Sequence, residues 1–420
     1  MKTYKTSRVF VPGGMPRLTY VSRNAVNLEG LLKYSIDNLH KLITVTGQTK
    51  SGKTVLVNKI LPRDDGANIW IDGGSIEKED DLWSTVLQET NSAHEVTKTT
   101  TSTSTNHVKG DVSGKLGIPV LAEVSGKGEI GTSRSGSSGE TRSIKSTPRA
   151  AGIKALRSFE GALVVDDFHY LPRDIQGSLI RALKPLVFDG LRSVVIAIPH
   201  RRFDAVRVER EMTGRVENID VPAWDENELR EIAETGFPLL NVNIAEDITR
   251  KIARQAYGSP HLMQEFCQRL AAKSGIAETM QRQITINQVN EQLFREAAEG
   301  TGKVIYDKLA RGPRQRTDRL QRALISGGTT DIYGVVLKAL SSLAPGLDTI
   351  EYEQIRSAIK AILIDALPQA HEVTRVLERM AEIASSDESS TPVIDWDKDE
   401  NKLHITDPFF AFYLKWGSIA

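Results

Sequence analysis

The segment that most constrains this chain is a glycine-bounded loop between an apolar strand pattern and an apolar helix pattern. The strand pattern covers Lys41–Thr46, and the helix pattern contains Val55, Leu56 and Ile60. The loop between them matches Gly-x4-Gly-Lys-Thr, which occurs where a strand turns into a helix around phosphate groups. Its residues are Gly47, Gln48, Thr49, Lys50, Ser51, Gly52, Lys53 and Thr54. This context predicts a phosphate-binding loop inside an alternating strand–helix architecture.

The residue types of this loop suit a nucleotide triphosphate and its magnesium ion. Glycines let consecutive backbone N–H groups curl around phosphate oxygens, and the following helix adds the positive end of its dipole. We expect Lys53 to reach the β- and γ-phosphates and the Thr54 hydroxyl to ligate Mg²⁺. The nucleotide-binding residues then run from Gly47 through Val55.

A second signal is an apolar strand that ends in two carboxylates. Ala162–Val165 is followed directly by Asp166 and Asp167. The carboxyl ends of parallel strands meet at the edge of the sheet where ligands bind. We expect Asp166 to hold magnesium through water and Asp167 to orient or deprotonate the attacking water.

The coarse pattern of the chain predicts an α/β fold with three parts. Strand and helix patterns alternate up to about residue 221, which implies a parallel sheet between two helical layers. Helical patterns continue from Glu226, and the last segment reads as three helices followed by a hairpin, the order of a winged helix. The expected domains are a core at 1–221, a helical lid at 222–300, and a linker with a winged helix at 301–420.

One segment interrupts the core, as an insertion at about residues 91–149. Serine, threonine and glycine make up about half of the residues from Thr97 to Thr147. Every even position from Val112 to Ile130 is nevertheless apolar or glycine, which is the period of a strand or hairpin. Three interpretations are open: a disordered solvated loop, an ordered hairpin that binds a partner, and a hairpin that inserts into a membrane.

The charge balance limits the case for nucleic acid. The 420 residues include 54 Lys plus Arg and 54 Asp plus Glu, so the formal net charge is zero. Nucleic-acid binding therefore requires a local patch, and one arginine cluster could be such a patch or a solvated linker. The predicted recognition helix, Glu372–Ala384, mixes acidic and basic residues and does not present a basic face. The cluster comprises Arg311, Arg314, Arg316, Arg319 and Arg322.

Composition also bears on the compartment. No apolar run approaches the roughly 18–20 residues that span a bilayer, and the N-terminal residues lack the apolar core of a signal peptide. The single cysteine, Cys267, excludes an intramolecular disulfide and is expected to be a small core residue. We expect a soluble, cytoplasmic protein without a membrane partner.

The phosphate loop and the Ala162–Asp167 strand together resemble the P-loop ATPases of the AAA+ and STAND groups. Tyr20-Val21-Ser22-Arg23 is similar to the aromatic-x-x-Arg box that these families place near the adenine. Gly258-Ser259-Pro260 is similar to the Gly-x-Pro motif of STAND lids. Asp407–Tyr413 resembles the Asp-Pro-aromatic ending of archaeal-type ATPases with a C-terminal winged helix. The resemblance implies a three-layer P-loop NTPase core.

The same resemblance implies nucleotide contacts outside the loop. Tyr20 and Arg23 are expected near the base, and Pro260 and His261 are expected to approach the nucleotide from the lid. His261 also fits an ordinary position at the start of a helix.

Further roles are implied at the end of the core. AAA+ relatives place an arginine finger, which acts on the neighbouring subunit's γ-phosphate, just before the strand-like Ile219–Val221. Arg215 is the candidate, with Arg207 and Arg210 as alternatives. His200 is either a polar sensor or part of a solvated strand end.

ATP and Mg²⁺ are the cofactors that the resemblance implies, with slow ATP hydrolysis as the activity. Asp167 stands where AAA+ motors usually carry Glu, which suits a STAND-type regulatory switch. Such a switch would form a homo-oligomer with ATP and engage an unidentified protein partner, in bacterial antiphage defence or in signalling. One alternative is a DNA-associated AAA+ ATPase, acting as a loader or transposition regulator. Another is an ATP-gated assembly whose insertion hairpins form a barrel or pore.

Overall fold

The computed structural model describes residues 2–90, 147–198, 214–313, 319–344, 346, 349–385 and 392–418. The predicted insertion lies outside these ranges except for its last three residues. The candidate sensor His200 and the alternative arginine fingers Arg207 and Arg210 also lie outside them.

Five parallel strands form the sheet of the core, in the order β2-β3-β4-β1-β5. Strands buried on both faces need apolar residues at nearly every position, which explains their continuous apolar runs. Leu163 and Val165 of β3 enter one hydrophobic cluster, whereas Ala162 and Val164 enter the cluster on the opposite face. The strands are β1 (Leu42–Gly47), β2 (Ile69–Asp72), β3 (Ala162–Asp166), β4 (Arg192–Ile196) and β5 (Val216–Val221).

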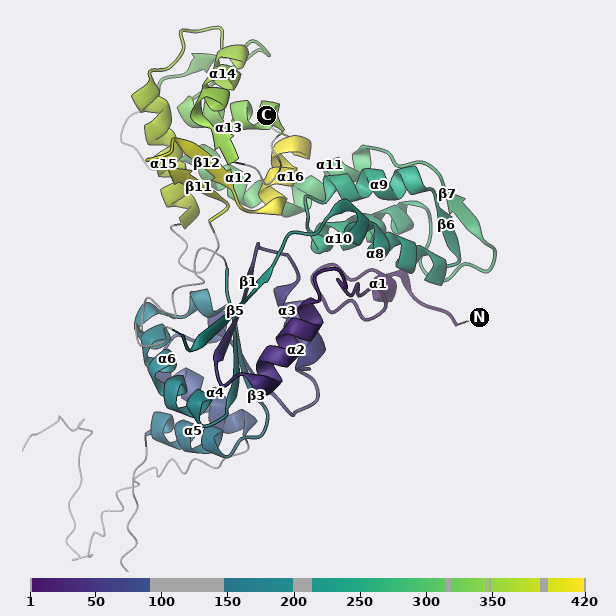
Figure 1. Cartoon of the computed structure of the whole chain (residues 1–420). Coiled ribbons are helices and arrows are strands. Elements are labelled where there is room, and N and C mark those ends of the chain that lie inside the picture. The colour runs from purple at the N-terminus through teal and green to yellow at the C-terminus, as the bar shows by residue number, and fades with distance from the viewer. Residues whose placement is uncertain are drawn as a thin grey trace, which may run out of the picture.

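Helices cover both faces of this sheet, so the predicted three-layer α/β core is confirmed (Figure 1). On one side lie α2 (Leu28–Asn38) and α3 (Lys53–Ile60). On the other side lie α4 (Glu79–Glu89), α5 (Pro148–Arg157) and α6 (Arg173–Phe188). The helices α4 and α5, which flank the insertion, pack directly against each other.

Above the carboxyl edge of the sheet lies a helical lid (Figure 1). Its helix α8 is capped by Asp225, whose side chain accepts a hydrogen bond from the Glu228 N–H at 2.8 Å. The first residues of the chain pack here as well, because Thr6 bonds the Ala277 carbonyl and Phe10 stacks on Phe237. The elements are α1 (Thr6–Val9), α8 (Glu226–Leu239), β6 (Val242–Ile244), α9 (Glu246–Gln255), α10 (Pro260–Lys273), β7 (Ile284–Ile286) and α11 (Gln292–Thr301).

The C-terminal domain contains three successive helices and then a hairpin, the element order expected from the sequence. A short strand that the sequence did not predict, β10, joins the hairpin in an antiparallel sheet of order β10-β12-β11. The elements are α12 (Lys303–Arg311), β8 (Arg322–Ala323), β9 (Thr329–Thr330), α13 (Ile332–Leu343), β10 (Thr349–Glu351), α14 (Tyr352–Ile362), α15 (Ala370–Ser385), β11 (Ile394–Asp397), β12 (Lys402–Ile405) and α16 (Pro408–Trp416).

The lid and the C-terminal domain share one continuous hydrophobic cluster. Helix α16 is the joint between them, because its aromatic side chains contact helices of both parts. Phe412 lies 5.1 Å from the Phe266 ring of α10, measured between ring centroids. Tyr413 lies at the same distance from Tyr306 of α12. Aromatic pairs at such distances stabilise beyond their buried area, so these two parts pack as one body.

Two arginines of the sequence-predicted cluster are not solvated. Arg319 forms an ion pair with Asp331 at 2.6 Å, and Arg322 forms one with Glu372 at 3.2 Å. Their side chains are only 15% and 11% exposed. The solvated-linker interpretation is therefore wrong for these two residues, and neither presents a free charge to nucleic acid. Arg314 and Arg316 lie outside the described ranges.

Within the part of the chain that the structure describes, no helix combines the length and the apolar character needed to cross a bilayer. Cys267 is fully buried in α10, as predicted, and burial raises the pKa of its thiol. A buried, protonated thiol of this kind is chemically inert.

Candidate functional site

The glycine-bounded loop of residues 47–54, called the phosphate loop below, joins β1 directly to α3. Two of its glycines are required by geometry. A Cβ at Gly47 would lie 2.5 Å from the Val221 carbonyl oxygen, so only glycine lets the end of β5 approach. Gly52 has φ +93°, which disfavours other residues. The local sequence therefore folds as the motif predicts.

Lys53 turns its ammonium back over the loop. Its Nζ donates hydrogen bonds to the carbonyl oxygens of Gly47 at 3.0 Å and Gln48 at 2.8 Å. Burial lowers the pKa of this amine to about 8, although the carboxylates of Asp167 and Asp166 oppose the shift. A nearby anion such as a phosphate would therefore stabilise the charged form of Lys53.

The loop also contains donors that suit a phosphate. The hydroxyls of Thr49 and Ser51 are buried, and neither has a hydrogen-bond partner among the described residues. Buried polar groups without partners are costly, and phosphate oxygens would satisfy them. The residues present therefore fit a polyphosphate.

Strand β3 brings its carboxylates to the same edge of the sheet, although β4 separates it from β1. Asp166 Oδ1 accepts hydrogen bonds from Thr54 Oγ1 at 3.1 Å and from the Asp167 N–H at 3.0 Å. Burial, followed by the charge of Asp167, raises the pKa of Asp166 to about 6. Thr54 and Asp166, predicted to serve magnesium, are in contact.

The donor set fits magnesium bound jointly with phosphates. Mg²⁺ in such sites takes one or two protein oxygens, and phosphates and waters supply the rest. No group of three or more histidine, cysteine or carboxylate side chains able to hold a metal occurs in the described ranges. Thr54 and Asp166 would be its protein contacts.

Asp167 adopts the left-handed backbone conformation, with φ +49°. Gly73 packs behind it so closely that a Cβ at Gly73 would lie 2.4 Å from the Asp167 carbonyl oxygen. Burial and the charge of Asp72 raise the pKa of Asp167, while Lys53 opposes the shift. Asp167 lines the cavity beside the phosphate loop, where it can accept a proton or orient a water.

We expect the nucleotide-free and metal-free protein to lose stability through Asp166 as pH rises. Because folding raises this pKa from 3.8 to about 6, the folded state binds the proton more tightly. The resulting stabilisation is complete below pH 3.8 and lost as pH passes about 6. Asp166→Asn should weaken this dependence and unfold at higher urea than the wild type at pH 8. Identical midpoints for both proteins at pH 5 and pH 8 would contradict this account.

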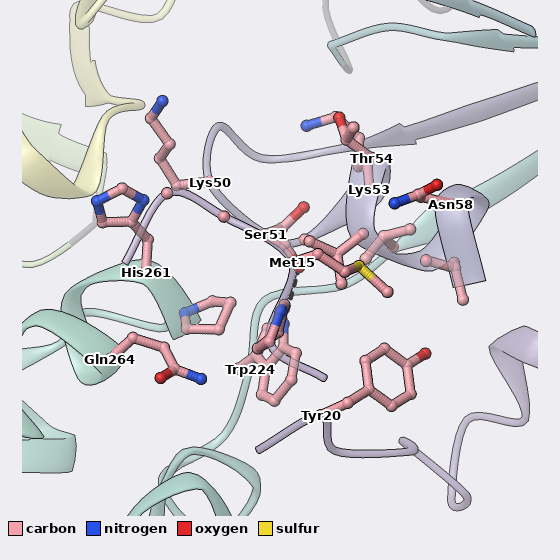
Figure 2. Close-up of a pocket in the computed structure, with 18 of the residues that line it drawn as sticks. Met15, Tyr20, Lys50, Ser51, Lys53, Thr54, Asn58, Trp224, His261 and Gln264 are labelled. Carbon is pink, nitrogen blue, oxygen red and sulfur yellow. Dashed lines mark hydrogen bonds between the residues drawn. The ribbon is translucent and has the colours of Figure 1, made fainter. Parts of the chain in front are cut away.

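A cavity of about 490 Å³ joins the phosphate loop to the N-terminal segment and the lid (Figure 2). It brings together most predicted nucleotide contacts that lie far apart in the sequence. Gly47, Gln48 and Asp166 are not among its lining residues. The predicted residues that line it are Tyr20, Arg23, Thr49, Lys50, Ser51, Gly52, Lys53, Thr54, Val55, Asp167, Pro260 and His261.

The end of the cavity farthest from Thr54 is lined by the N-terminal segment, Trp224 and the lid, and includes aromatic side chains. Tyr20, Trp224 and Gln264 lie there, away from Thr54, and Met15 lies nearer to Ser51 (Figure 2). Burial and a hydrogen bond to Glu29 raise the pKa of Tyr20, so this phenol stays neutral. Apolar walls with a few polar groups are typical of pockets that take a flat ring system.

Arg23 lines this cavity, but its guanidinium is directed to the connection between β5 and the lid. It donates to the Pro222 and Ala223 carbonyls at 2.7 and 3.0 Å. It also forms two 2.8 Å hydrogen bonds with Glu228. In this conformation Arg23, which was predicted to lie near the base, therefore holds the connection between β5 and the lid.

The C-terminal helix α16 reaches the same site. The Phe409 ring lies 5.0 Å from the His261 ring and 5.7 Å from the Lys50 ammonium. Burial and the charge of Lys50 lower the pKa of His261, which favours the neutral ring. In Figure 2, Lys50 and His261 lie together at one side of the loop. His261 is thus both the second residue of α10 and a neighbour of the phosphate loop.

Arg215 is not part of this cavity. It immediately precedes β5, and its carbonyl accepts a hydrogen bond from the N–H of Leu42, at the start of β1. The phosphate loop follows the opposite end of β1, and Arg215 is exposed. Arg215 therefore cannot reach the phosphates of its own chain in this conformation.

Sequence reasoning missed several residues of the site. Trp224 donates from its indole Nε1 to the Ser51 carbonyl at 2.8 Å. Gln264 joins the lid to the N-terminal segment, because it accepts from the Val11 N–H and donates to Thr19. These contacts link positions more than 170 residues apart. No local sequence pattern marks Trp224 or Gln264 as part of this site.

Neither a protein-family model nor a curated protein matches the sequence. Among solved structures, a Walker-type ATPase of Pyrococcus abyssi aligns with a TM-score of 0.54 and 15% identity, over 97% of this chain and 99% of that chain. The Orc1 protein of Aeropyrum pernix in complex with DNA aligns at 0.45 and 13%, over 98% and 95%. A STAND protein with a tetratricopeptide repeat sensor from Pyrococcus horikoshii aligns at 0.36 and 14%, over 94% and 42%. The first comparison shows the fold: that of a Walker-type P-loop ATPase, C-terminal domain included.

Proposed function

We propose that this chain binds ATP with Mg²⁺ and hydrolyses it slowly. The observation that carries the proposal is the convergence of Lys53, the Thr54–Asp166 pair and Asp167 at one edge of the sheet. Lys53 would stabilise the β- and γ-phosphates, and Thr54 and Asp166 would hold the metal. Asp167 would orient or deprotonate the attacking water.

The proposal extends to a regulatory switch of the STAND type rather than a motor. The C-terminal domain, interpreted as a winged helix, contacts the phosphate loop through Phe409 and Lys50. A nucleotide would change the surroundings of Lys50 and thereby the position of α16. The ion pairs of Arg319 and Arg322 argue against a DNA-binding role for that part of the cluster.

Self-association in the ATP state is part of the proposal. The exposed Arg215 could reach the γ-phosphate only from a neighbouring copy of the chain, as an arginine finger does. The insertion and the C-terminal domain would then be free to engage a protein partner.

The test is phosphate release from Mg²⁺–ATP by the purified protein over a range of protein concentrations. We expect slow turnover whose rate per subunit rises with concentration in the wild type and stays flat in Arg215→Ala. Stimulation by duplex DNA that disappears at high salt would instead favour the DNA-associated alternative. Failure to bind ATP at millimolar concentration would overturn the proposed function itself.

A further inference from the structure

The indole of Trp224 ties the connection between the core and the lid to the phosphate loop. Trp224 lies between the end of β5 at Val221 and the first residue of α8 at Glu226. Its Nε1 donates to the Ser51 carbonyl oxygen at 2.8 Å. This bond joins the connection after β5 to the loop residue that precedes Gly52.

The peptide between Ser51 and Gly52 is the group that this bond orients. None of the described peptide bonds is cis, and in a trans peptide the C=O and the N–H point in opposite directions. With its carbonyl held by Trp224, this peptide directs the Gly52 N–H away from the indole. Gly52, here at φ +93°, could adopt many other conformations, because glycine has no Cβ. A contact from outside the loop can therefore fix the orientation of this peptide.

Trp224 is itself held in place. The Arg23 guanidinium lies 5.0 Å from the indole ring, within the range of a cation–π contact. Arg23 also binds Glu228 through two hydrogen bonds, and the side chains are only 6% and 15% exposed. Glu228 in turn accepts from the Asp225 N–H at 2.9 Å, at the start of α8. The first turn of the lid is therefore connected through Arg23 and Trp224 to the phosphate loop.

We propose that Trp224 is a positioning residue: its indole N–H fixes the Ser51–Gly52 peptide so that the Gly52 N–H is presented to a phosphate oxygen. The inference rests on the proposed function, since it assigns a role within the same nucleotide site. It also makes the geometry of the phosphate loop depend on the conformation of residues 222–224. A lid that moved this connection would withdraw one donor from the phosphates.

The decisive variant is Trp224→Phe, which keeps an aromatic ring and removes the N–H donor. Binding is measured by calorimetry for ATP, for inorganic triphosphate and for adenosine. We expect the affinities for ATP and triphosphate to fall by the same factor, about tenfold for one hydrogen bond to a charged group, with adenosine unchanged. A base-stacking role would instead weaken ATP and adenosine and spare triphosphate, and that result would overturn the inference.

The matched control is Trp70→Phe. Trp70 donates from Nε1 to the Leu61 carbonyl at 3.2 Å in the same core, and it does not line the cavity. Its variant should bind all three ligands as the wild type does. If Trp224→Phe fails to fold, 3-benzothienylalanine at position 224 keeps the ring shape without the N–H. An unchanged affinity for triphosphate in that protein would contradict the inference. If the wild type binds neither ATP nor triphosphate, the proposed function itself is overturned.

Discussion

Replacing Lys53 with alanine is expected to reduce ATP turnover by about two to three orders of magnitude, the effect typical of losing one preorganised donor to a developing negative charge. The ammonium is buried over the loop, where it donates to the Gly47 and Gln48 carbonyls, whereas Lys50, which also lines the cavity, extends over the Phe409 ring. ATP affinity should fall as well, because the cation is needed in the ground state. Phosphate release and calorimetric titration measure the two effects.

The control for this variant is Lys33→Ala. Lys33 lies on α2, is 70% exposed, and pairs only with Asp37 in the same helix at 3.2 Å. Its loss should leave turnover and affinity within experimental error. Turnover of Lys53→Ala within threefold of the wild type would mean that the phosphate loop does not act as we propose.

Asp167→Asn is expected to separate binding from chemistry. The amide keeps the size of the carboxylate but accepts a proton poorly, so turnover should fall by about 10²- to 10⁴-fold. ATP affinity should stay equal or improve, because a negative charge facing the phosphates is removed. Single-turnover hydrolysis beside equilibrium binding would show both.

Asp72→Asn is the matched control for that change. Asp72 ends β2 and caps the next turn by accepting from the Gly74 N–H at 2.9 Å. It lies close enough to raise the pKa of Asp167 but does not line the cavity. Equal losses of turnover in the two variants would mean that the combined charge of the carboxylates matters. That result would contradict the specific role of Asp167.

The parts of the site that the sequence predicted are those encoded locally. The strand, glycine loop and helix around Lys53 are consecutive, so the motif spacing is enough to predict their order and the place of the phosphate loop. Asp166 and Asp167 follow a buried strand directly, so their place at the carboxyl edge of the sheet follows from the parallel topology. The C-terminal helices and hairpin were likewise visible as periodic patterns.

The remaining parts depend on contacts between distant segments. Nothing near Trp224 indicates that its indole would bond the Ser51 carbonyl, because that bond exists only once the lid is packed. The pairing of Arg322 with Glu372 spans fifty residues, and the sequence shows only an arginine-rich stretch. Because Arg319 and Arg322 are mostly buried in the folded protein, they form internal ion pairs and do not add to a basic surface.

The common core of the lid and the C-terminal domain has a mechanical consequence. Because α16 packs its aromatic rings against α10 and α12, these parts would turn together in any motion about the short connection at residues 222–224. Such an arrangement would work as a lever whose pivot lies beside the phosphate loop and whose long arm is the C-terminal domain (Figure 1). A sub-ångström shift of the Ser51 peptide at the pivot would become a displacement of several ångströms at α14, which lies at the far end of that arm (Figure 1).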